Sequence, residues 1–370
     1  MRVLLTGGGT GGHVYPALAI AEIIKRNSPD SEIAFVGTKT GIENRLTRDA
    51  GYTIYHVNIQ GLRRSLSPAN LKTAYLTLTS PIKAKKIIKE FKPDIVIGTG
   101  GYVSYPLLRA ASSLGVPAMV HESNAVPGVA VKQLQKRMDT VLVNFESTAA
   151  YLKKGANVIC VGNPLRGDFS RTDKKTARRM LGVPEETGCV VLSFGGSLGA
   201  AKINEAVLGA MESFTGKRPD ILHFHATGKN GFADFSKRFS ETGLDGKKNL
   251  VVAEYFHDMP FRMAAADIVV CRAGAMTLTE IAVMKKCAVL IPSPNVTDNH
   301  QYKNAKVLAD AGGALLLEEV DLTPEGFSAL LAGLCDNAQK RRELEENIGR
   351  FVRTDAGKLI WNEIKRLTSK

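Results

Sequence analysis

Residues 7–13 read Gly-Gly-Gly-Thr-Gly-Gly-His, directly after the apolar run Val3-Leu4-Leu5 and shortly before the apolar run Pro16–Ile20. This order predicts a buried strand that passes through a glycine turn into a helix. Glycines leave backbone N–H groups bare at the positive end of that helix, which suits a phosphate or pyrophosphate. His13, at the edge of the loop, can take or give a proton. A turn packed tightly by glycines is the simpler alternative, but it explains neither the excess of glycine nor the histidine.

The same loop also satisfies the dinucleotide-binding pattern Gly-x-Gly-x-x-Gly, through Gly7, Gly9 and Gly12. An NAD-dependent oxidoreductase would need an acidic residue at the end of the second strand to hold a ribose. The second expected strand ends in Phe35-Val36-Gly37-Thr38, without an acid. The oxidoreductase alternative is therefore disfavoured.

Short apolar segments alternate with helical patterns along the chain, as in open parallel sheets. The expected strands are Arg2–Thr6, Glu32–Val36, Ile54–Val57, Ile95–Gly98, Ala118–His121, Thr140–Val143, Cys189–Ser193, Ile221–Ala226, Leu250–Glu254, Ile268–Cys271, Ala288–Ile291 and Ala314–Leu317. The expected helices include Pro16–Arg26, Ile42–Ala50, Asn70–Phe91 (with a break near Pro81), Tyr105–Leu114, Arg171–Arg179 and Glu343–Leu367. The pattern predicts an α/β protein with two Rossmann-like, doubly wound domains, residues 1–163 and 164–342, with residues 343–370 crossing back to the first.

The chain has 370 residues, enough for two domains with full cores, and a net charge of +13. No apolar run is long enough for a transmembrane helix, and the first residues lack the features of a signal peptide. The five cysteines are scattered, so free thiols in a reducing compartment are expected, and no metal-binding set is evident. The positive charge fits nucleic acid, an anionic membrane or an anionic substrate. Nucleic acid is disfavoured because no recognised binding motif is present.

Positive charge is concentrated between Leu62 and Lys92, a stretch that contains eight Lys and Arg residues and only one acidic residue, Glu90. Leucines, isoleucines and Tyr75 are interleaved with them at helical spacing. Such a mixture can place leucines in a membrane interface and lysines on anionic head groups. The alternative is an amphipathic helix whose leucines face the domain core.

Four further segments repeat the theme of a strand that ends in small or polar residues. Two are glycine loops, Gly98–Ser104 and Gly195–Ala200, which suit anions or sugars. His121–Ala125 and Arg272–Glu280 each follow an apolar run with polar side chains. Ligands of open α/β sheets lie beyond the carboxyl ends of the strands, so these segments are expected to line a cleft between the domains. Asp298–Gln301 is another polar cluster after a strand. Surface loops are the simpler alternative for His121–Ala125 and Asp298–Gln301, and an exposed helix charge is the simpler alternative for Glu280.

Together, in order and spacing, these motifs resemble the MurG family of bacterial peptidoglycan GlcNAc transferases. The shared segments are Gly7–His13, Gly98–Ser104, His121–Ala125, Gly162–Arg166, Gly195–Ala200, Arg272–Glu280 and Asn299–Gln301. The resemblance covers nearly the whole chain and implies the GT-B architecture. It implies inverting transfer of GlcNAc from UDP-GlcNAc to the MurNAc 4-hydroxyl of lipid I, which gives lipid II for cell-wall synthesis.

The resemblance also implies roles for the domains and for particular residues. The first domain would bind the acceptor and the cytoplasmic face of the membrane, and the second would bind UDP-GlcNAc. His13 matches the proposed base. Glu122 is the second catalytic candidate, because its place after an apolar run allows it to orient or ionise a partner. Acceptor binding is assigned to Gly9, Thr10, Gly11, Gly12, His13, Gly100, Gly101 and Tyr102. Donor binding is assigned to Thr10, Gly11, Gly12, Asn124, Arg166, Ser197, Tyr255, Phe256, Arg272, Met276, Thr277, Glu280, His300 and Gln301.

Within the donor set, Glu280 matches a ribose-binding carboxylate, and His300 and Gln301 match the pair that reads GlcNAc. Main chain near Tyr255 and Phe256 is expected to read the uracil edge. Helix N-termini with Arg166 and Arg272 would stabilise the leaving diphosphate, so no metal or other cofactor is expected. The expected partners are UDP-GlcNAc, lipid I, the anionic membrane surface, and cell-wall synthesis and division proteins.

The chain departs from the family pattern at Ser123, Leu198, His300 and Phe256, and the bulk of Phe256 is expected to alter the base pocket. Other functions remain open from the residues alone. A sugar-nucleotide epimerase would share the fold and the donor pocket but would not need the basic, apolar stretch between Leu62 and Lys92. A glycolipid galactosyltransferase would share the membrane contact as well. A non-enzymatic binding protein would not explain His13 and the repeated glycine loops.

Overall fold

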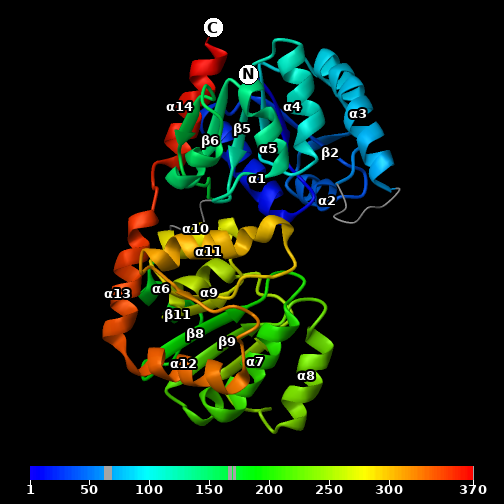
Figure 1. The fold of residues 1–370 in the computed structure, drawn as a ribbon. Helices are drawn as coiled ribbons and strands as arrows, with labels where there is room; N and C mark the ends of the chain where they lie inside the picture. Colours follow the sequence, from blue (N-terminus) through cyan, green and yellow to red (C-terminus); the bar gives the residue numbers. More distant parts are fainter. Residues whose placement is uncertain (62–68, 166–168, 170–171, 370) are drawn as a thin grey trace. The chain divides into compact units, whose positions relative to one another are not determined.

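The computed structural model describes residues 1–61, 69–165, 169 and 172–369. It forms two compact units, Met1–Arg166 with Arg353–Lys370, and Gly167–Val352 (Figure 1). The helices and strands of the first unit are β1 (Arg2–Thr6), α1 (Gly11–Asn27), β2 (Glu32–Gly37), α2 (Ile42–Asp49), β3 (Thr53–His56), α3 (Ala69–Phe91), β4 (Ile95–Gly98), α4 (Ser104–Ser113), β5 (Ala118–Glu122), α5 (Val129–Leu134), β6 (Thr140–Val143), β7 (Val158–Cys160) and α14 (Ala356–Thr368).

The sheet of the first unit has the strand order β3-β2-β1-β4-β5-β6-β7, with every pair parallel. Alternate side chains of β1 point to opposite faces. Val3 and Leu5 are buried with α1 and α14, whereas Leu4 is buried with α3, α4 and α5. Both faces are therefore covered, which explains why the strands read as continuous apolar runs.

The second unit repeats this plan with the strand order β10-β9-β8-β11-β12-β13, again parallel. Its elements are α6 (Lys174–Met180), β8 (Cys189–Phe194), α7 (Ala201–Ser213), β9 (Ile221–Ala226), α8 (Phe232–Glu241), β10 (Leu250–Ala253), α9 (Met259–Ala265), β11 (Ile268–Cys271), α10 (Ala275–Val283), β12 (Cys287–Leu290), α11 (His300–Asp310), β13 (Leu315–Leu316), α12 (Pro324–Asp336) and α13 (Ala338–Ile348). The predicted pair of doubly wound parallel sheets is confirmed.

Every strand expected from the sequence is present, with each end within one residue, and β7 is an additional strand. The expected break at Pro81 is wrong, because α3 continues through it. The expected single helix over 343–367 is also wrong. It is divided into α13 and α14 by a short 3-10 turn, Gly349–Phe351, and by extended backbone at Val352. The helix expected at 171–179 begins at Lys174, after Asp173 caps it by accepting from the backbone N–H of Thr176.

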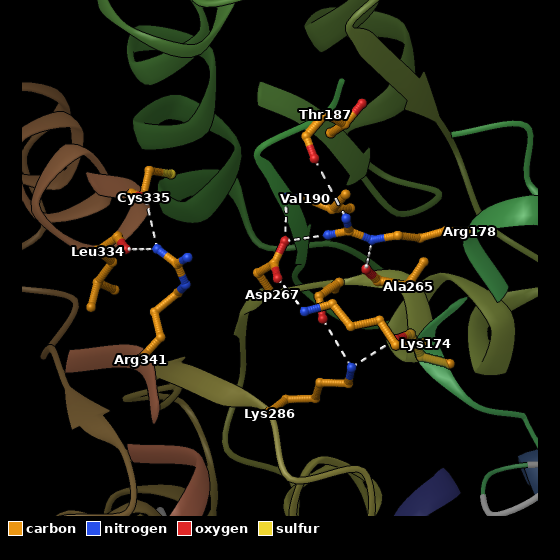
Figure 2. Close-up of polar contacts among 12 residues, drawn as sticks. Lys174, Arg178, Thr187, Val190, Ala265, Asp267, Lys286, Leu334, Cys335 and Arg341 are labelled. Atoms are coloured by element: carbon orange, nitrogen blue, oxygen red, sulfur yellow. Dashed lines mark hydrogen bonds and ion pairs between the residues drawn. The ribbon is translucent and has the colours of Figure 1, made fainter. Parts of the chain in front are cut away.

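A buried ionic cluster lies at the amino edge of the second sheet (Figure 2). Asp267, just before β11, accepts hydrogen bonds from Arg178 and from the backbone N–H of Val190, both at 2.6 Å, and pairs with Lys174. Lys286 donates to the carbonyls of Ala264 and Ala266 at 2.6 and 2.9 Å. Because the amino edge is opposite the loops that follow the strands, this cluster holds the unit together rather than lining the candidate site.

No helix in the described ranges is long and apolar enough to cross a membrane.

Candidate active site

The first two glycine loops follow β1 and β4, the two neighbouring strands at which the strand order of the first sheet reverses. This switch point is where open α/β sheets bind ligands. The two loops are tied together, because Thr99 donates from its backbone N–H to the Thr6 carbonyl and from its hydroxyl to the His13 carbonyl, at 2.8 and 2.6 Å. The structure therefore joins two motifs that are about ninety residues apart in the sequence.

The second loop needs glycine because the first loop approaches its backbone closely. A Cβ on Gly101, whose φ is +75°, would lie 2.2 Å from the carbonyl oxygen of Gly8. A Cβ on Gly100 would lie 2.9 Å from the His13 ring. Both glycines thus make room for the imidazole and for the first loop, and a side chain at either position would displace them.

His13 lies in the first turn of α1, which begins at Gly11 and so includes the last three residues of the glycine loop. Its Nδ1 lies 3.1 Å from the hydroxyl of Thr10, and the ring is partly exposed. The Thr10 side chain does not cap the helix, and Gly9, Thr10 and Gly12 are exposed. Backbone amides at a helix N-terminus and an imidazole therefore share one surface, which suits an anionic ligand with a hydroxyl to be deprotonated.

Glu122, at the end of β5, is buried, and its carboxyl group is satisfied by its own loop. It accepts from the backbone and side-chain amides of Asn124, both at 3.0 Å, and from the backbone N–H of Gly128 at 2.8 Å. Burial raises the pKa of Glu122 despite these three bonds. This geometry indicates that Glu122 orients Asn124. A direct catalytic role for Glu122 stays a prediction.

Tyr102 packs over the first loop, where a Cβ on Gly9 would lie 2.8 Å from its ring. Burial, and then the charge of Glu43, raise the pKa of Tyr102. Glu43 is a residue that the sequence analysis missed. It is buried at the start of α2 and accepts from the backbone N–H of Gly9 at 3.2 Å. The signal was the pair of glycines shortly before it, Gly37 and Gly41.

In the second unit, the third glycine loop follows β8 and the segment that starts at Arg272 follows β11. These strands are again the pair at which the strand order reverses. Ser197 and Leu198 are exposed in the third loop, so Leu198 does not contribute to a core. A Cβ on Gly199 would lie 2.2 Å from the Thr227 carbonyl, which explains a glycine with a φ of +87°.

Arg272 is mostly buried and fully engaged by its own unit. Its guanidinium donates to the carbonyls of Ile291 and Pro292, at 3.2 and 3.1 Å, and pairs with Glu319. Arg272 thus connects the segment after β12 with the segment after β13. Contact with a diphosphate stays a prediction for this side chain, and Glu319 is a second residue that the sequence analysis missed.

Helix α10 begins at Ala275 without a side-chain cap and carries three further expected donor residues, Met276, Thr277 and Glu280. Thr277 and Glu280 are one turn apart, so they lie on the same side of the helix, whereas Met276 is buried. Burial raises the pKa of Glu280 to about 7. A carboxyl group with such a pKa is poised to change its proton occupancy when a ligand binds.

The expected base-reading segment directs its two aromatic rings differently. Tyr255 is exposed, whereas Phe256 is buried against Phe224, with ring centroids 6.1 Å apart. The Arg262 guanidinium lies 4.0 Å from the centre of the Phe256 ring. The Phe256 ring thus packs inside the unit and does not line a pocket. Its bulk can therefore affect the expected uracil site only indirectly.

His300 and Gln301 open α11 after two residues in left-handed backbone, Asp298 and Asn299, with φ of 54° and 50°. Two such non-glycine residues in succession are strained, a feature often found at functional sites. His300 Nδ1 lies 2.8 Å from the Thr297 carbonyl, and Gln301 accepts from the backbone N–H of Ser293 at 2.9 Å.

A cavity of about 610 Å³ lies beside this segment in the second unit. It is lined by Lys202, Pro292, Pro294, Asn299, Tyr302, Glu318, Glu319 and Val320. Arg166, another expected donor residue, lies outside the described residues. Within the part of the chain that is described, no group of three or more His, Cys, Asp or Glu side chains could hold a metal ion.

These features match known proteins over the full chain. The models of the glycosyltransferase family 28 N-terminal and C-terminal domains match residues 3–143 and 190–359. A protein of Thermoanaerobacter sp. strain X514 is 39% identical over 368 residues, 100% of each chain, and one of Acetivibrio thermocellus is 38% identical over 365 residues, 99% of this chain and 98% of the other. Both carry the name UDP-N-acetylglucosamine–N-acetylmuramyl-(pentapeptide) pyrophosphoryl-undecaprenol N-acetylglucosamine transferase.

Solved structures agree. The structure of MurG from Acinetobacter baumannii is 30% identical, with a TM-score of 0.75 and 99% of each chain covered. A UDP-GlcNAc 2-epimerase from Neisseria meningitidis shares the fold, with a TM-score of 0.68 over 99% of this chain and 100% of the other, but only 15% of the sequence. The fold has the GT-B architecture, and the two family models identify the chain as a glycosyltransferase of that class. Within that class, the chain belongs to glycosyltransferase family 28 and to its MurG family.

Proposed function

We propose that this chain transfers GlcNAc from UDP-GlcNAc to the MurNAc 4-hydroxyl of lipid I, with inversion at the anomeric carbon, and so produces lipid II for peptidoglycan. The observation that carries the proposal is the similarity, over the full length, to relatives named for this reaction. Similarity to the epimerase is confined to the fold. The chain is therefore a UDP-GlcNAc-dependent hexosyltransferase.

For the first unit we infer an acceptor-binding role. The exposed amides at the start of α1, with Gly100, Gly101 and Tyr102 beside them, would hold the acceptor pyrophosphate. His13 would remove the proton of the attacking hydroxyl through a ring nitrogen. Thr10, 3.1 Å from Nδ1, fixes the orientation of the ring and supports proton transfer at the other nitrogen, Nε2.

For the second unit we infer a donor-binding role. The third loop with Ser197, the start of α10 with Thr277, and the cations Arg166 and Arg272 would stabilise the charge that develops on the leaving UDP. Glu280 would accept hydrogen bonds from the ribose hydroxyls, and main chain at 255–256 would read uracil. His300 and Gln301, with Asn124 of the first unit, would read the GlcNAc hydroxyls.

The direct test is to incubate the purified protein with UDP-GlcNAc and a soluble lipid I analogue and to measure UDP release and the disaccharide product. We expect UDP release to depend on the acceptor. UDP release without acceptor, or formation of the C2 epimer of the sugar nucleotide in its absence, would instead indicate the epimerase alternative.

We also propose that no metal ion takes part in this transfer. Helix N-termini and arginines provide positive potential, which is the role that a divalent cation plays at other diphosphate sites. We expect the rate of transfer to remain unchanged in excess chelator. A complete loss of activity that added Mg²⁺ restores would contradict this.

Membrane association is a further part of the proposed function, and α3 supports it (Figure 1). Leu71, Tyr75, Leu78 and Ile82 recur at helical spacing and are 66–78% exposed. The exposed lysines Lys72, Lys83, Lys86 and Lys89 lie on the same helix. Apolar side chains beside cations suit the surface of an anionic membrane. Of the basic stretch, residues 62–68 lie outside the described residues.

A further inference from the structure

Glu43 is a buried acidic residue next to the first glycine loop, and nothing in the proposed reaction uses it. Its side chain is 1% exposed. One oxygen, Oε1, accepts from both the backbone N–H and the hydroxyl of Thr38, at 2.9 and 2.6 Å. The other oxygen, Oε2, accepts from the backbone N–H of Gly9 at 3.2 Å. The carboxyl group therefore connects the end of β2 to the loop that follows β1.

Three glycines make the space for this carboxyl group. A Cβ on Gly41 would lie 2.1 Å from Oε1, and one on Gly8 would lie 2.7 Å from the carboxyl carbon. A Cβ on Gly37 would lie 2.7 Å from Cγ of Glu43. Glycines from the loop after β1 and from the end of β2 with its connection to α2 thus enclose one acidic side chain, so the site is built around Glu43. A charged side chain in such an enclosure is costly unless each of its oxygens is hydrogen-bonded, as here.

The contact with Gly9 determines which amides of the loop reach the surface. Gly9 has a φ of +84°, a conformation that only glycine adopts readily. Its N–H points inward to Glu43, so it is not available to an outer ligand. The exposed backbone of Thr10 and Gly12 follows immediately, at the first turn of α1.

We propose that Glu43 is a positioning residue for the acceptor site: by holding the N–H of Gly9 it sets the path of the loop that presents the next amides to a pyrophosphate. This inference rests on the proposed binding of the acceptor at the first loop. Glu43 touches neither substrate, and its effect passes through the backbone of residues 8–12.

The variant Glu43→Gln separates this role from simple support of α2. A glutamine has the same shape but only one acceptor oxygen. If that oxygen keeps the bonds from Thr38, the amide NH₂ faces the N–H of Gly9, and two donors repel each other. Thr47→Val is the matched control. Thr47 is also buried on α2, and its hydroxyl donates to the backbone carbonyl of Glu43 at 2.6 Å rather than to the loop.

The first measurement needs no substrate. Backbone hydrogen exchange is measured over residues 7–13. At Gly9 it is expected to be at least about tenfold faster in Glu43→Gln than in the native protein, because a hydrogen bond to a charged acceptor is lost. Thr47→Val is expected to leave this exchange unchanged. Unchanged exchange at Gly9 in Glu43→Gln overturns the inference, whether or not the protein transfers GlcNAc.

The second measurement is steady-state kinetics with UDP-GlcNAc and a lipid I analogue. Glu43→Gln is expected to lower kcat/KM for the acceptor by about tenfold and to leave KM for UDP-GlcNAc unchanged. Thr47→Val is expected to leave both constants unchanged. Equal kinetics in the two variants, with an active native protein, overturns the inference and leaves the proposed function standing. A native protein without acceptor-dependent transfer overturns the proposed function instead.

Discussion

His13 is held by neighbours on two sides, and both bear on its proposed role as a base. Thr10 contacts Nδ1, and the bare Cα of Gly100 leaves room for the ring. We expect His13→Ala to lower kcat by about 10²- to 10⁴-fold, the usual contribution of a general base. KM for UDP-GlcNAc should change little, because most of the proposed donor residues lie in the other unit. A similar loss of UDP-GlcNAc binding, together with a lower melting temperature, would show that the histidine is structural.

We expect Glu280 to make donor binding depend on pH. Its pKa of about 7 is raised by burial, so in the free protein the proton is lost as the pH rises through 7. The ionised form accepts two ribose hydroxyls better than the protonated form does. We therefore expect affinity for UDP-GlcNAc to fall as the pH decreases from 8 to 6, measured by calorimetry. UDP-GlcNAc is the suitable ligand because, unlike UDP, it has no terminal phosphate that titrates in this range.

Glu280→Gln provides the control for that pH dependence. Its affinity for UDP-GlcNAc should be about tenfold weaker at pH 8, because a charge-assisted hydrogen bond is lost, and should not vary between pH 6 and 8. Native affinity in this variant would refute the ribose assignment.

The sequence identified the residues whose signal is local and left out those whose partners are distant. His13 and its glycines stand within seven positions, so composition alone reveals them. Glu43 looks like an ordinary charge on a short helix until the fold brings Gly9 to it. Arg272 was found because it follows a strand, but its partner Glu319 is far along the chain and became evident only from the geometry.

At the scale of elements, α3 has two different halves. Its later residues Ala84, Ile87, Ile88 and Phe91 are buried against the sheet, whereas Leu71, Tyr75, Leu78 and Ile82 are exposed. The later part therefore fits the interpretation as a core-facing helix, whereas the proposed membrane contact concerns only the exposed part. Periodicity could not separate them, because a core face and a membrane face have the same helical spacing.

This division predicts which substitutions affect membrane binding. Reversing the charge of Lys83, Lys85 and Lys86 to Glu should reduce sedimentation with anionic vesicles several-fold, since each cation near such a surface contributes about 1 kcal/mol. Leu71→Ser with Leu78→Ser should reduce it as well, without lowering the melting temperature, because both side chains are already exposed. Neutral vesicles are the control. Unchanged sedimentation of all variants would contradict membrane binding by α3 and would indicate that its exposed face is simply solvated.

Helix ends were the least predictable elements. The divided C-terminal helix follows from Gly349 and from the extended Val352, which interrupt an otherwise helical pattern of charged and apolar residues. By contrast, strand ends were predicted closely, because both faces of the sheets are buried and the strands therefore read as continuous apolar runs.

At the scale of the whole molecule, the ionic cluster of the second unit should govern the response of stability to alkali (Figure 2). Burial lowers the pKa of Lys286 to about 8 from the usual 10.5. Between these values the unfolded chain binds the proton and the folded chain does not, so this group makes stability rise with pH. The shift corresponds to about 3 kcal/mol in the free energy of unfolding.

Lys286→Met isolates this contribution. We expect the free energy of unfolding of the native protein, measured by calorimetry, to rise relative to that of the variant between pH 8 and 10.5. Below pH 8 the difference between the two proteins should not change with pH. Parallel profiles across the whole range would contradict the lowered pKa.

The placement of α14 has a consequence for how the protein is made. Ile360, Ile364 and Leu367 are buried with Val3 and Leu5 of β1, so the first unit is assembled from both ends of the chain. On a ribosome, the early strands emerge long before the helix that covers them, and the whole second unit is translated in between. At about 5–20 residues per second, that interval lasts roughly 10 to 40 seconds. Throughout it, one apolar face of the first sheet lacks part of its cover, and the nascent chain is a natural client for a chaperone.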